Sequence, residues 1–383
     1  MERDTPCEVY KKCGGCQLQN MDYQRQLQWK QGKCRKLLGG FGKVAPIMGM
    51  DNPAHYRNKV QRAFQRHRSG RIISGIYQSS TDRVVPVKHC RTEDRTAQKI
   101  IRTVGRLTEE FRLTVYDPGS RRGFLRHVLV RRGVKTGEIM VVLVTGTPVF
   151  TAKKHFTAAL CKAHPEITTV VHNVYTGTLP MILGSNEKIL YGSGYIRDQL
   201  CGCEFRISSR SFYQINPTQT ERLYQTAMDF AALEETDQVL DAYCGIGTIG
   251  LVAAGQAARV IGVESNGDAV KDAIENGKRN NRKNIWFQKG DAGAFMKLLR
   301  AEGEQVDVLF MDPPRTGADK TFLDAVTQLA PKRVVYISCN PETLARDLRR
   351  LQGQGGYQVK GIQPVDMFPH TNHVECVVLL TRA

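Results

Sequence analysis

The sequence predicts an α/β protein in two parts: a mainly antiparallel β domain, then a mostly parallel, doubly wound sheet with an antiparallel edge. After Val239, short apolar runs alternate with Gly- or Pro-rich loops and helical stretches, which is typical of parallel strands joined by crossover helices. Before Phe205, apolar and polar residues alternate over 61–77, 126–144 and 169–190, as they do in half-buried antiparallel strands.

The elements of the second half follow one another at regular intervals. We expect strands at 238–241, 259–263, 285–288, 306–311 and 334–338. One helix should begin in the glycine-rich stretch 245–254, and another at Asn266, whose side chain is a favourable N-cap. The apolar runs 357–359 and 373–380 predict two more strands at an antiparallel edge, and 17–38 has helical character.

The net positive charge of the chain comes entirely from its first half. The net charge is +18, and residues 1–205 hold 34 Lys and Arg residues against 16 Asp and Glu residues, so the remainder is neutral overall. This distribution fits a protein that binds a polyanion, because Lys and Arg neutralise phosphates and release counterions. We place a domain boundary near Phe205, where the bias ends, since each part is long enough to bury its own core.

The composition argues against several other classes of protein. The N-terminus has no apolar segment of the kind that a secretion signal requires, and no apolar run reaches the roughly 18 residues of a membrane span. The 11 cysteines are therefore more often metal ligands, nucleophiles or core residues than disulfides. We expect a cytoplasmic, monomeric protein that does not bind membranes.

A glycine-rich loop follows the first strand of the second half. Asp241 is followed by Gly245, Gly247 and Gly250, which match the G-x-G-x-x-G pattern of a dinucleotide site. A carboxylate at the position of Asp241 would lie close to a pyrophosphate, whereas it suits the zwitterionic methionine part of S-adenosylmethionine. Glu264 and Asp291 end the next two strands and could bind the ribose hydroxyls and the adenine edge, so we favour S-adenosylmethionine as cofactor.

The ends of two later strands carry candidate reactive residues. The prolines after Asp312 make a rigid loop, and methyltransferases that act on exocyclic amino groups have a similar loop with an aromatic residue where this chain has Arg315. Cys339 ends the fifth strand, where a thiolate could add to carbon 6 of uracil and make carbon 5 nucleophilic. Glu375 begins another strand and is a candidate base for the proton on carbon 5.

Five motifs occur in the order found in the RNA uracil-C5 methyltransferase family, which this chain resembles over nearly its whole length. They are SFYQIN at 211–216, DAYCGIG at 241–247, DPPR at 312–315, SCNP at 338–341 and HVE at 373–375. The resemblance implies a Rossmann-like class I methyltransferase domain, with Cys339 as nucleophile and Glu375 as base. It also implies a cofactor-binding set of Gln214, Tyr243, Thr248, Glu264, Asp291 and Asp312.

Four further cysteines have the pattern of a metal site. Cys7, Cys13 and Cys16 lie close together in the sequence and are joined by the distant Cys90. Four thiolates suit either zinc or an iron–sulfur cluster, and the spacing leaves both open. The pattern is similar to the 4Fe–4S ligands of the family branch that methylates 23S ribosomal RNA. The resemblance thus implies a 4Fe–4S cluster and 23S ribosomal RNA as substrate.

The resemblance also implies interleaved domains. Residues 1–18 and 51–205 would form the iron–sulfur and RNA-binding domain, and residues 19–50 and 206–383 the methyltransferase domain. Many family members begin with a small OB-like RNA-binding domain, which we expect to be missing because six residues precede Cys7. Phosphates would then contact the basic half through Arg57, Lys59, Arg62, Arg126, Arg131 and Arg132, while Phe212 or Tyr213 would stack on a base.

Other functions stay open at this point. The same chemistry could act on transfer RNA. An amino-group RNA methyltransferase would use the Asp312 loop but leave Cys339 and Glu375 without a task. A non-catalytic RNA-binding protein with a relic cofactor site is a third possibility, and the complete set of site residues argues against it.

Overall fold

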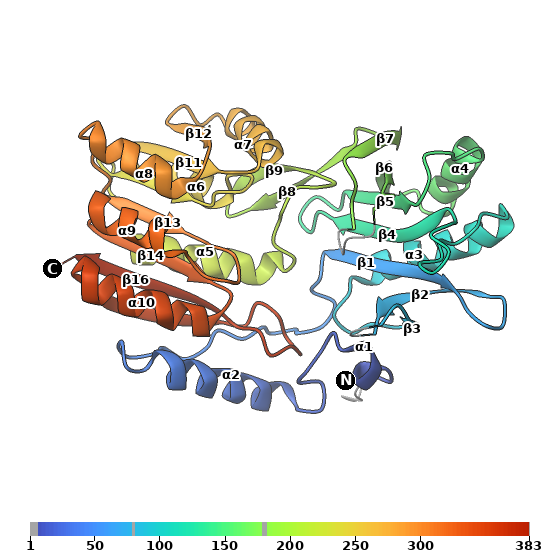
Figure 1. Ribbon diagram of the computed structural model, residues 1–383, viewed down its shortest axis with the longest axis horizontal. Helices are drawn as coiled ribbons and strands as arrows, with labels where there is room; N and C mark the ends of the chain where they lie inside the picture. Colours follow the sequence, from blue (N-terminus) through green and yellow to red (C-terminus); the bar gives the residue numbers. More distant parts are fainter. Residues whose placement is uncertain (1–6, 79–80, 178–181, 383) are drawn as a thin grey trace. The chain divides into compact units, whose positions relative to one another are not determined.

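The computed structural model describes residues 7–78, 81–177 and 182–382. The chain forms two compact units, each assembled from separate stretches of sequence (Figure 1). Unit 1 comprises Met1–Asn20, Pro53–Asp198 and Ile207–Arg210, and unit 2 comprises Met21–Asn52, Gln199–Arg206 and Ser211–Ala383. Within the described ranges, no helix combines the length and the apolar character that a membrane crossing requires.

Unit 1 is built on a seven-stranded sheet in the order β3-β2-β1-β4-β5-β6-β7. Its strands are β1 (Lys59–Arg66), β2 (Ile72–Tyr77), β3 (Val84–Pro86), β4 (Leu125–Arg132), β5 (Ile139–Thr145), β6 (Ile167–Val174) and β7 (Asn186–Tyr191). The predicted antiparallel character is confirmed for every pair except β5 and β6, which run parallel. Helix α4 (Lys153–Ala163) connects those two strands, as a parallel pair requires.

Helix α3 (Arg95–Glu110) supplies much of the core of unit 1. Asp94 caps it, because its side chain accepts a hydrogen bond of 2.8 Å from the backbone N–H of Ala97. Ile100, Ile101 and Val104 recur at helical spacing and are completely buried in the core cluster that includes the sheet residues Val60, Phe64, Val128 and Val141. The alternate residues of these strands, such as Gln61 and Ala63 of β1, therefore face the other side of the sheet.

The remaining elements of the first half are short. Helix α1 (Tyr10–Cys13) is a single turn. Strands β8 (Tyr195–Leu200) and β9 (Cys203–Ser208) form a separate hairpin. Its two turn residues, Cys201 and Gly202, have φ angles of 49° and 77°, which is the backbone that tight hairpin turns prefer.

Unit 2 contains the doubly wound sheet, in the order β12-β11-β10-β13-β14-β16-β15. Its strands are β10 (Gln238–Ala242), β11 (Arg259–Glu264), β12 (Ile285–Lys289), β13 (Val308–Met311), β14 (Arg333–Ser338), β15 (Tyr357–Val365) and β16 (Glu375–Arg382). The first five of these are parallel, and β16 runs antiparallel to both β14 and β15. The predicted Rossmann-like fold with an antiparallel edge is confirmed.

The helices of unit 2 cover this sheet. The cluster of buried side chains on one face includes residues from α2 (Tyr23–Leu38), α8 (Ala292–Ala301), α9 (Lys320–Leu329) and α10 (Pro341–Gly355). The other helices, which also contact strands of the sheet, are α5 (Pro217–Ala231), α6 (Thr248–Ala253) and α7 (Gly267–Arg279). The strand order reverses at β10, so a crevice is expected at the carboxyl ends of β10 and its neighbours.

Candidate active site

The carboxyl edge of the parallel sheet gathers the residues predicted to react. Asp312 directly follows β13, and Cys339 directly follows β14. Glu375 is the first residue of β16, which runs antiparallel to β14 with Ser338 opposite Cys376. Because Cys339 and Glu375 are the next residues on the two paired strands, they lie on neighbouring strands at the same edge.

The glycine-rich loop between β10 and α6 adopts a backbone that needs glycine. Gly245 and Gly247 have φ angles of 56° and 83°, and Tyr243 shares the left-handed region with a φ of 62°. A Cβ atom on Gly247 would lie 2.7 Å from the Phe287 ring, so a larger residue would not fit. The Glu264 carboxylate accepts a hydrogen bond of 3.2 Å from the Gly245 N–H, which ties the loop to the end of β11.

Asp241 is a candidate ligand residue outside the predicted cofactor set. Its carboxylate is completely buried, and Oδ2 accepts a hydrogen bond of 2.7 Å from the Gly250 N–H. Among the residues that the structure describes, Oδ1 has no hydrogen-bond partner, and burial raises the pKa of this carboxyl to about 8. A ligand that donates a hydrogen bond, such as the methionine ammonium of S-adenosylmethionine, fits this unsatisfied oxygen.

Thr248 and Gln214 of the predicted set both lie next to α5. Thr248 begins α6, and its hydroxyl is 2.9 Å from the Tyr224 hydroxyl. Tyr224 is buried on α5, and the charges of Asp312 and Asp241 contribute to raising its pKa, so these side chains are neighbours. Gln214 is buried just before Asn216, the N-cap of α5. The sequence pattern gave no signal for Tyr224, which reads as an ordinary core residue.

Tyr243 and Asp291 also lie within reach of one another. The Tyr243 ring packs on the Phe322 ring, with 5.0 Å between the centroids. Burial raises the pKa of Tyr243, and the charges of Asp319 and Asp291 add to the shift. Asp291 is exposed and caps α8 by accepting a hydrogen bond of 2.8 Å from the Ala294 N–H. Four of the predicted cofactor residues thus end or closely follow successive strands of one sheet, namely Tyr243, Glu264, Asp291 and Asp312.

Three acidic or thiol groups and one arginine share the reacting end of the site. Burial, followed by the negative charges of Glu375 and Asp312, raises the pKa of the Cys339 thiol to about 11, and the Arg315 guanidinium opposes this shift. Burial and then Asp312 raise the pKa of Glu375 to about 8, again against Arg315. Burial raises the pKa of Asp312 to about 7. Arg315 is therefore the cation that favours ionisation of both Cys339 and Glu375.

The loop that carries Asp312 and Arg315 is fixed to the start of α10. Asn340 Nδ2 donates a hydrogen bond of 3.2 Å to the carbonyl of Arg315, and the Thr343 hydroxyl donates one of 3.4 Å to the same oxygen. Asn340 also caps α10 through its contact with the Glu342 N–H. The residue after Cys339 thereby holds the backbone of the arginine that faces Cys339.

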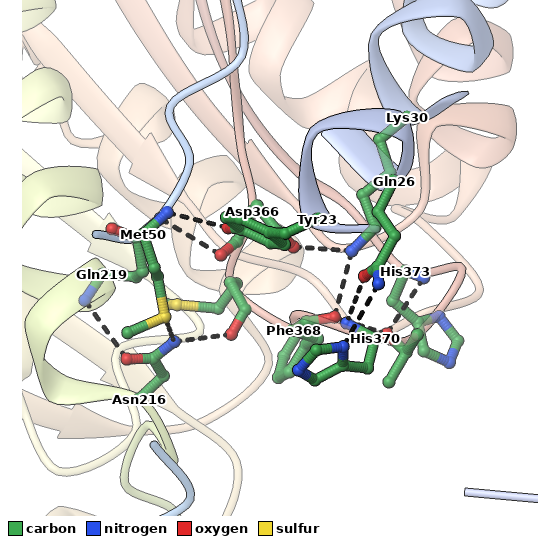
Figure 2. A network of polar contacts seen from close by, with 12 residues as sticks. Tyr23, Gln26, Lys30, Met50, Asn216, Gln219, Asp366, Phe368, His370 and His373 are labelled. Atoms are coloured by element: carbon green, nitrogen blue, oxygen red, sulfur yellow. Dashed lines mark hydrogen bonds and ion pairs between the residues drawn. The ribbon is translucent and has the colours of Figure 1, made fainter. Parts of the chain in front are cut away.

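A buried ion pair holds the loop that leads into Glu375 (Figure 2). Lys30 Nζ on α2 lies 2.6 Å from Asp366 Oδ1, and neither side chain is exposed to solvent. The Tyr23 hydroxyl donates a hydrogen bond of 2.8 Å to the other carboxylate oxygen of Asp366, and Lys30 also donates one of 3.0 Å to the Phe368 carbonyl. Each charged group therefore has several partners, as a buried charge requires.

Further contacts from α2 and α5 bind the same loop. Gln26 Oε1 on α2 accepts a hydrogen bond of 2.9 Å from the His370 N–H. On the α5 side, Asn216 Nδ2 donates one of 2.9 Å to the Met367 carbonyl, and Gln219 Nε2 donates one of 3.1 Å to the Asp366 carbonyl. The segment from 366 to 374 is thus held from both helices directly before Glu375 (Figure 2).

Comparisons with known proteins identify the family. A family model described as tRNA (uracil-5-)-methyltransferase matches residues 180–383. An uncharacterized RNA methyltransferase of Halalkalibacterium halodurans is 44% identical over 98% of this chain and 83% of its own length. The chain belongs to the uracil-5 methyltransferase family. An uncharacterized RNA methyltransferase of Bacillus cereus is 42% identical over 99% of this chain and 83% of its own length.

A solved structure resembles this uracil-5 methyltransferase over nearly its whole length. The tRNA (uracil-54, C5)-methyltransferase of Pyrococcus abyssi, in complex with S-adenosyl-L-homocysteine, is 27% identical, with a TM-score of 0.80. The match covers 96% of this chain and 86% of that one. The predicted fold, the dependence on S-adenosylmethionine and the activity as an RNA methyltransferase are supported together.

The predicted metal site of the methyltransferase is not supported. Cys7, Cys13, Cys16 and Cys90 all belong to unit 1. Burial raises the pKa of Cys13 and of Cys16, and the charges of neighbouring cysteines add to this: Cys90 and Cys7 for Cys13, and Cys90 and Cys13 for Cys16. In the described part of the chain, however, no group of three or more His, Cys, Asp or Glu side chains is arranged to hold a metal ion.

Part of the predicted phosphate-binding set is wrong. Arg62 is completely buried, with Nη2 2.5 Å from Glu93 Oε2. Arg131 is also buried, and Nη2 donates a hydrogen bond of 3.4 Å to the Ser209 carbonyl. Neither guanidinium is accessible to a phosphate. Lys59 is half-buried, and burial lowers its pKa to about 8, so its ammonium is still largely charged near pH 7.

The predicted stacking residues differ in accessibility. The Phe212 side chain is 64% exposed, whereas Tyr213 is buried and packs on Phe205 with ring centroids 6.3 Å apart. Of the two, only Phe212 presents a ring to a nucleobase.

Proposed function

We propose that this protein methylates carbon 5 of a uridine in RNA, with Cys339 as the nucleophile and Glu375 as the base. The observation that supports this most is the pairing of β14 with β16, which sets Cys339 and Glu375 on neighbouring strands at one edge. Asp312 and Arg315 are close enough to shift the pKa of both. An amino-group methyltransferase has no use for a thiol and a carboxyl so placed.

The reaction proceeds through a covalent bond to the protein. The Cys339 thiolate adds to carbon 6 of the uracil, and the electron pair of the carbon 5–carbon 6 double bond moves toward the oxygen on carbon 4. Carbon 5 of this enolate then takes the methyl group. Glu375 removes the proton left on carbon 5, the double bond re-forms, and the thiolate leaves carbon 6. Arg315 favours the thiolate that begins the cycle, because it opposes the rise in the pKa of Cys339.

We place the cofactor site at the same carboxyl edge of the sheet, in the half away from Cys339 and Glu375. S-adenosylmethionine supplies the methyl group when bound, and we assign its binding to Gln214, Tyr243, Thr248, Glu264, Asp291 and Asp312, with Asp241 added. The unpartnered Oδ1 of Asp241 and the tight turn at Gly247 support this assignment. Asp312 lies between the two halves, and we assign it a second contact with the target uracil.

Trapping with 5-fluorouridine tests this reaction. RNA containing 5-fluorouridine, mixed with the protein and S-adenosylmethionine, should give an SDS-resistant protein–RNA adduct, because fluorine on carbon 5 is not removed as a proton. Cys339→Ala should form no adduct. The matched control is Cys161→Ala, which removes a partly exposed thiol of unit 1. No adduct with the unaltered protein, despite methylation of ordinary RNA, would favour amino-group chemistry.

We propose 23S ribosomal RNA as the substrate, and transfer RNA is the second candidate. The first rests on the similarity of the Cys7, Cys13, Cys16 and Cys90 pattern to the ribosomal RNA branch. The second is favoured by the likeness to the Pyrococcus abyssi enzyme. Incubation with each RNA and labelled S-adenosylmethionine, then mapping of 5-methyluridine, should label 23S ribosomal RNA. Label in transfer RNA alone would assign the second substrate.

The 4Fe–4S cluster stays a proposal that rests on the spacing of these four cysteines and on the family resemblance. Anaerobically purified protein should contain about four irons per chain and absorb in the visible range. Zinc in place of iron, or neither metal, would remove the cluster from the proposal and leave the methylation chemistry unaffected.

A further inference from the structure

A cavity of about 540 Å³ opens on the sheet of unit 1, away from α3. Its floor crosses three strands, because Ala63 of β1 pairs with Gly75 of β2 on one side and with His127 of β4 on the other. Ala63 leaves room above the sheet, and Gly75 cannot be larger because a Cβ atom there would collide with the Val85 carbonyl of β3. The volume lies within the roughly 300–1,000 Å³ of small-molecule sites.

Aromatic rings and arginines form the walls of this cavity. Tyr77, Tyr116, Arg121 and Arg126 line it. The Arg126 guanidinium lies 4.0 Å from the Tyr116 ring centroid and 4.7 Å from that of Tyr175. Its Nη1 donates hydrogen bonds to two backbone carbonyls. The planar guanidinium is therefore held in place between rings, and Tyr77, 36% exposed, presents a ring to an incoming ligand.

One buried polar group of the cavity lacks a partner. The His127 side chain is 7% exposed, and in the described ranges its Nδ1 makes no hydrogen bond. Burial lowers the pKa of His127 to about 4, so the ring is neutral near pH 7 and offers one donor and one acceptor. A ligand with polar edges would supply the hydrogen bond that this buried nitrogen otherwise lacks.

A second, cationic hollow adjoins the first. It measures about 770 Å³ and shares Thr81 and Asp82 with the cavity. Its basic lining residues are Lys12, Arg66, His67, Arg68 and Arg83, against the single acid Asp82. A row of cations beside an aromatic pocket matches the layout of single-stranded nucleic acid, in which a charged backbone runs beside flat bases.

We propose that the cavity binds one unpaired nucleobase of an RNA strand, stacked on Tyr77 and hydrogen-bonded to His127, and that the adjoining hollow holds the phosphates next to it. This inference rests on the proposed function in one respect, that the substrate is RNA. It adds a recognition site in unit 1 for a base other than the methylated uridine.

Equilibrium binding to a uridine-free strand tests the proposal. The probe is a fluorescent 12-nucleotide strand of adenosine and cytidine, compared with an RNA duplex of equal length and with AMP and CMP. Tyr77→Ala should weaken binding of the strand by about tenfold, because base–aromatic stacking contributes about 1–3 kcal/mol. Tyr77→Phe keeps the ring and should bind normally. Tyr191→Ala is the matched control, since that tyrosine of β7 is 47% exposed and does not line the cavity.

The outcomes separate the alternatives. Duplex affinity should be lower than that of the strand and unaffected by Tyr77→Ala. If Tyr77→Ala bound the strand with the affinity of the unaltered protein, the proposal would be overturned. It would also be overturned by AMP or CMP binding as tightly as the strand in a Tyr77-dependent manner, which would assign the cavity to a free nucleotide. A strand without uridine gives Cys339 nothing to attack, so failure here leaves the methylation chemistry standing, and loss of the 5-fluorouridine adduct leaves the cavity standing.

Discussion

At the scale of single residues, the site gathers three acidic side chains that burial makes harder to ionise. Asp241, Asp312 and Glu375 all have pKa values raised to about 7 or 8, first of all by burial. The neighbouring charges add to the effect at Asp241 and Glu375. For a base that must take a proton from carbon 5, a pKa near the working pH balances availability of the carboxylate against its basicity.

The raised pKa of Glu375 predicts a pH-dependent gain in stability for Glu375→Gln. Between its ordinary value of 4.5 and about 8, the folded chain keeps a proton that the unfolded chain has lost, so the free energy of unfolding falls as pH rises through this window. The variant has no such proton. The free energy of unfolding of the variant minus that of the unaltered protein should therefore grow from pH 5 to pH 8, by an amount on the order of a few kcal/mol, and the difference in melting temperature should grow with it.

Thermal melts across that pH range check this, with Glu235→Gln at an exposed position as control. A constant difference would contradict the raised pKa. The same variant should also accumulate methylated covalent RNA, because proton removal from carbon 5 is impaired while thiolate addition is not.

The residues that we propose to react could be picked out from the sequence because they follow strands, and strand ends are visible as apolar runs followed by Gly, Pro or Asn. Cys339 and Asp312 were found in this way. The role of Arg315 as the opposing cation depends on which way a surface side chain turns, which no pattern encodes. Arg62 shows the converse: a cluster of basic residues looks like a phosphate site until its buried partner Glu93 is known.

At the scale of elements, α2 matters for the site although it carries no reacting residue. Tyr23, Gln26 and Lys30 recur on one face of the helix and bind the loop before Glu375. Their spacing of three and four residues is the signal that sequence reasoning had available. It was missed because polar residues on a helix usually face water.

Removing the ammonium of Lys30 should be far more damaging than removing its neighbour on the same helix. Lys30→Met leaves Asp366 buried without its cation, which costs about 3–5 kcal/mol. Lys33→Met is the matched control, since Lys33 pairs with a largely exposed Glu342, a contact that contributes about 0–1 kcal/mol. Denaturant unfolding measures both, and adding Asp366→Asn to Lys30→Met should recover part of the loss. Equal effects of the two lysine variants would contradict the structural role given to the ion pair.

The elements of unit 2 were predictable because each strand is followed by a clear loop and helix. Unit 1 was less so. Alternation predicted strands over 61–77, 126–144 and 169–190, and α3 was not recognised despite the cap at Asp94 and the apolar stripe at Ile100, Ile101 and Val104. Helix α4 was also missed. Since a helical crossover connection is the sequence signal of a parallel pair, nothing indicated that β5 and β6 run parallel.

At the scale of the whole molecule, the two halves of the sequence differ in charge. The entire net charge of +18 lies in residues 1–205. With Arg62 and Arg131 buried, the polyanion must contact other cations, and Arg68 and Arg83 are exposed cations that line the same hollow. These are the residues through which the polyanion should be held.

Arg68→Gln combined with Arg83→Gln should weaken RNA binding and reduce its salt dependence. Each lost phosphate contact lowers the slope of log affinity against log salt by about 0.7 for a single strand. Binding of S-adenosylhomocysteine, measured by calorimetry, should not change, because the cofactor residues lie in unit 2. Arg106→Gln is the control, since that arginine is already paired with Glu110. A slope equal to that of the unaltered protein would mean that the RNA path lies elsewhere.

The ion pair between Lys30 and Asp366 joins positions 336 residues apart, and this has a consequence for synthesis on the ribosome. At roughly 5–20 residues per second, α2 emerges some 15–70 s before the carboxylate that neutralises Lys30 exists. Until then the ammonium has to stay in water, because burying it alone is unfavourable. A nascent chain stalled before Asp366 should therefore be cut by protease within 23–38, whereas the released chain should resist cleavage there. During that interval, α2, which later fixes the loop before Glu375, stays unpacked until the last strands have been synthesised.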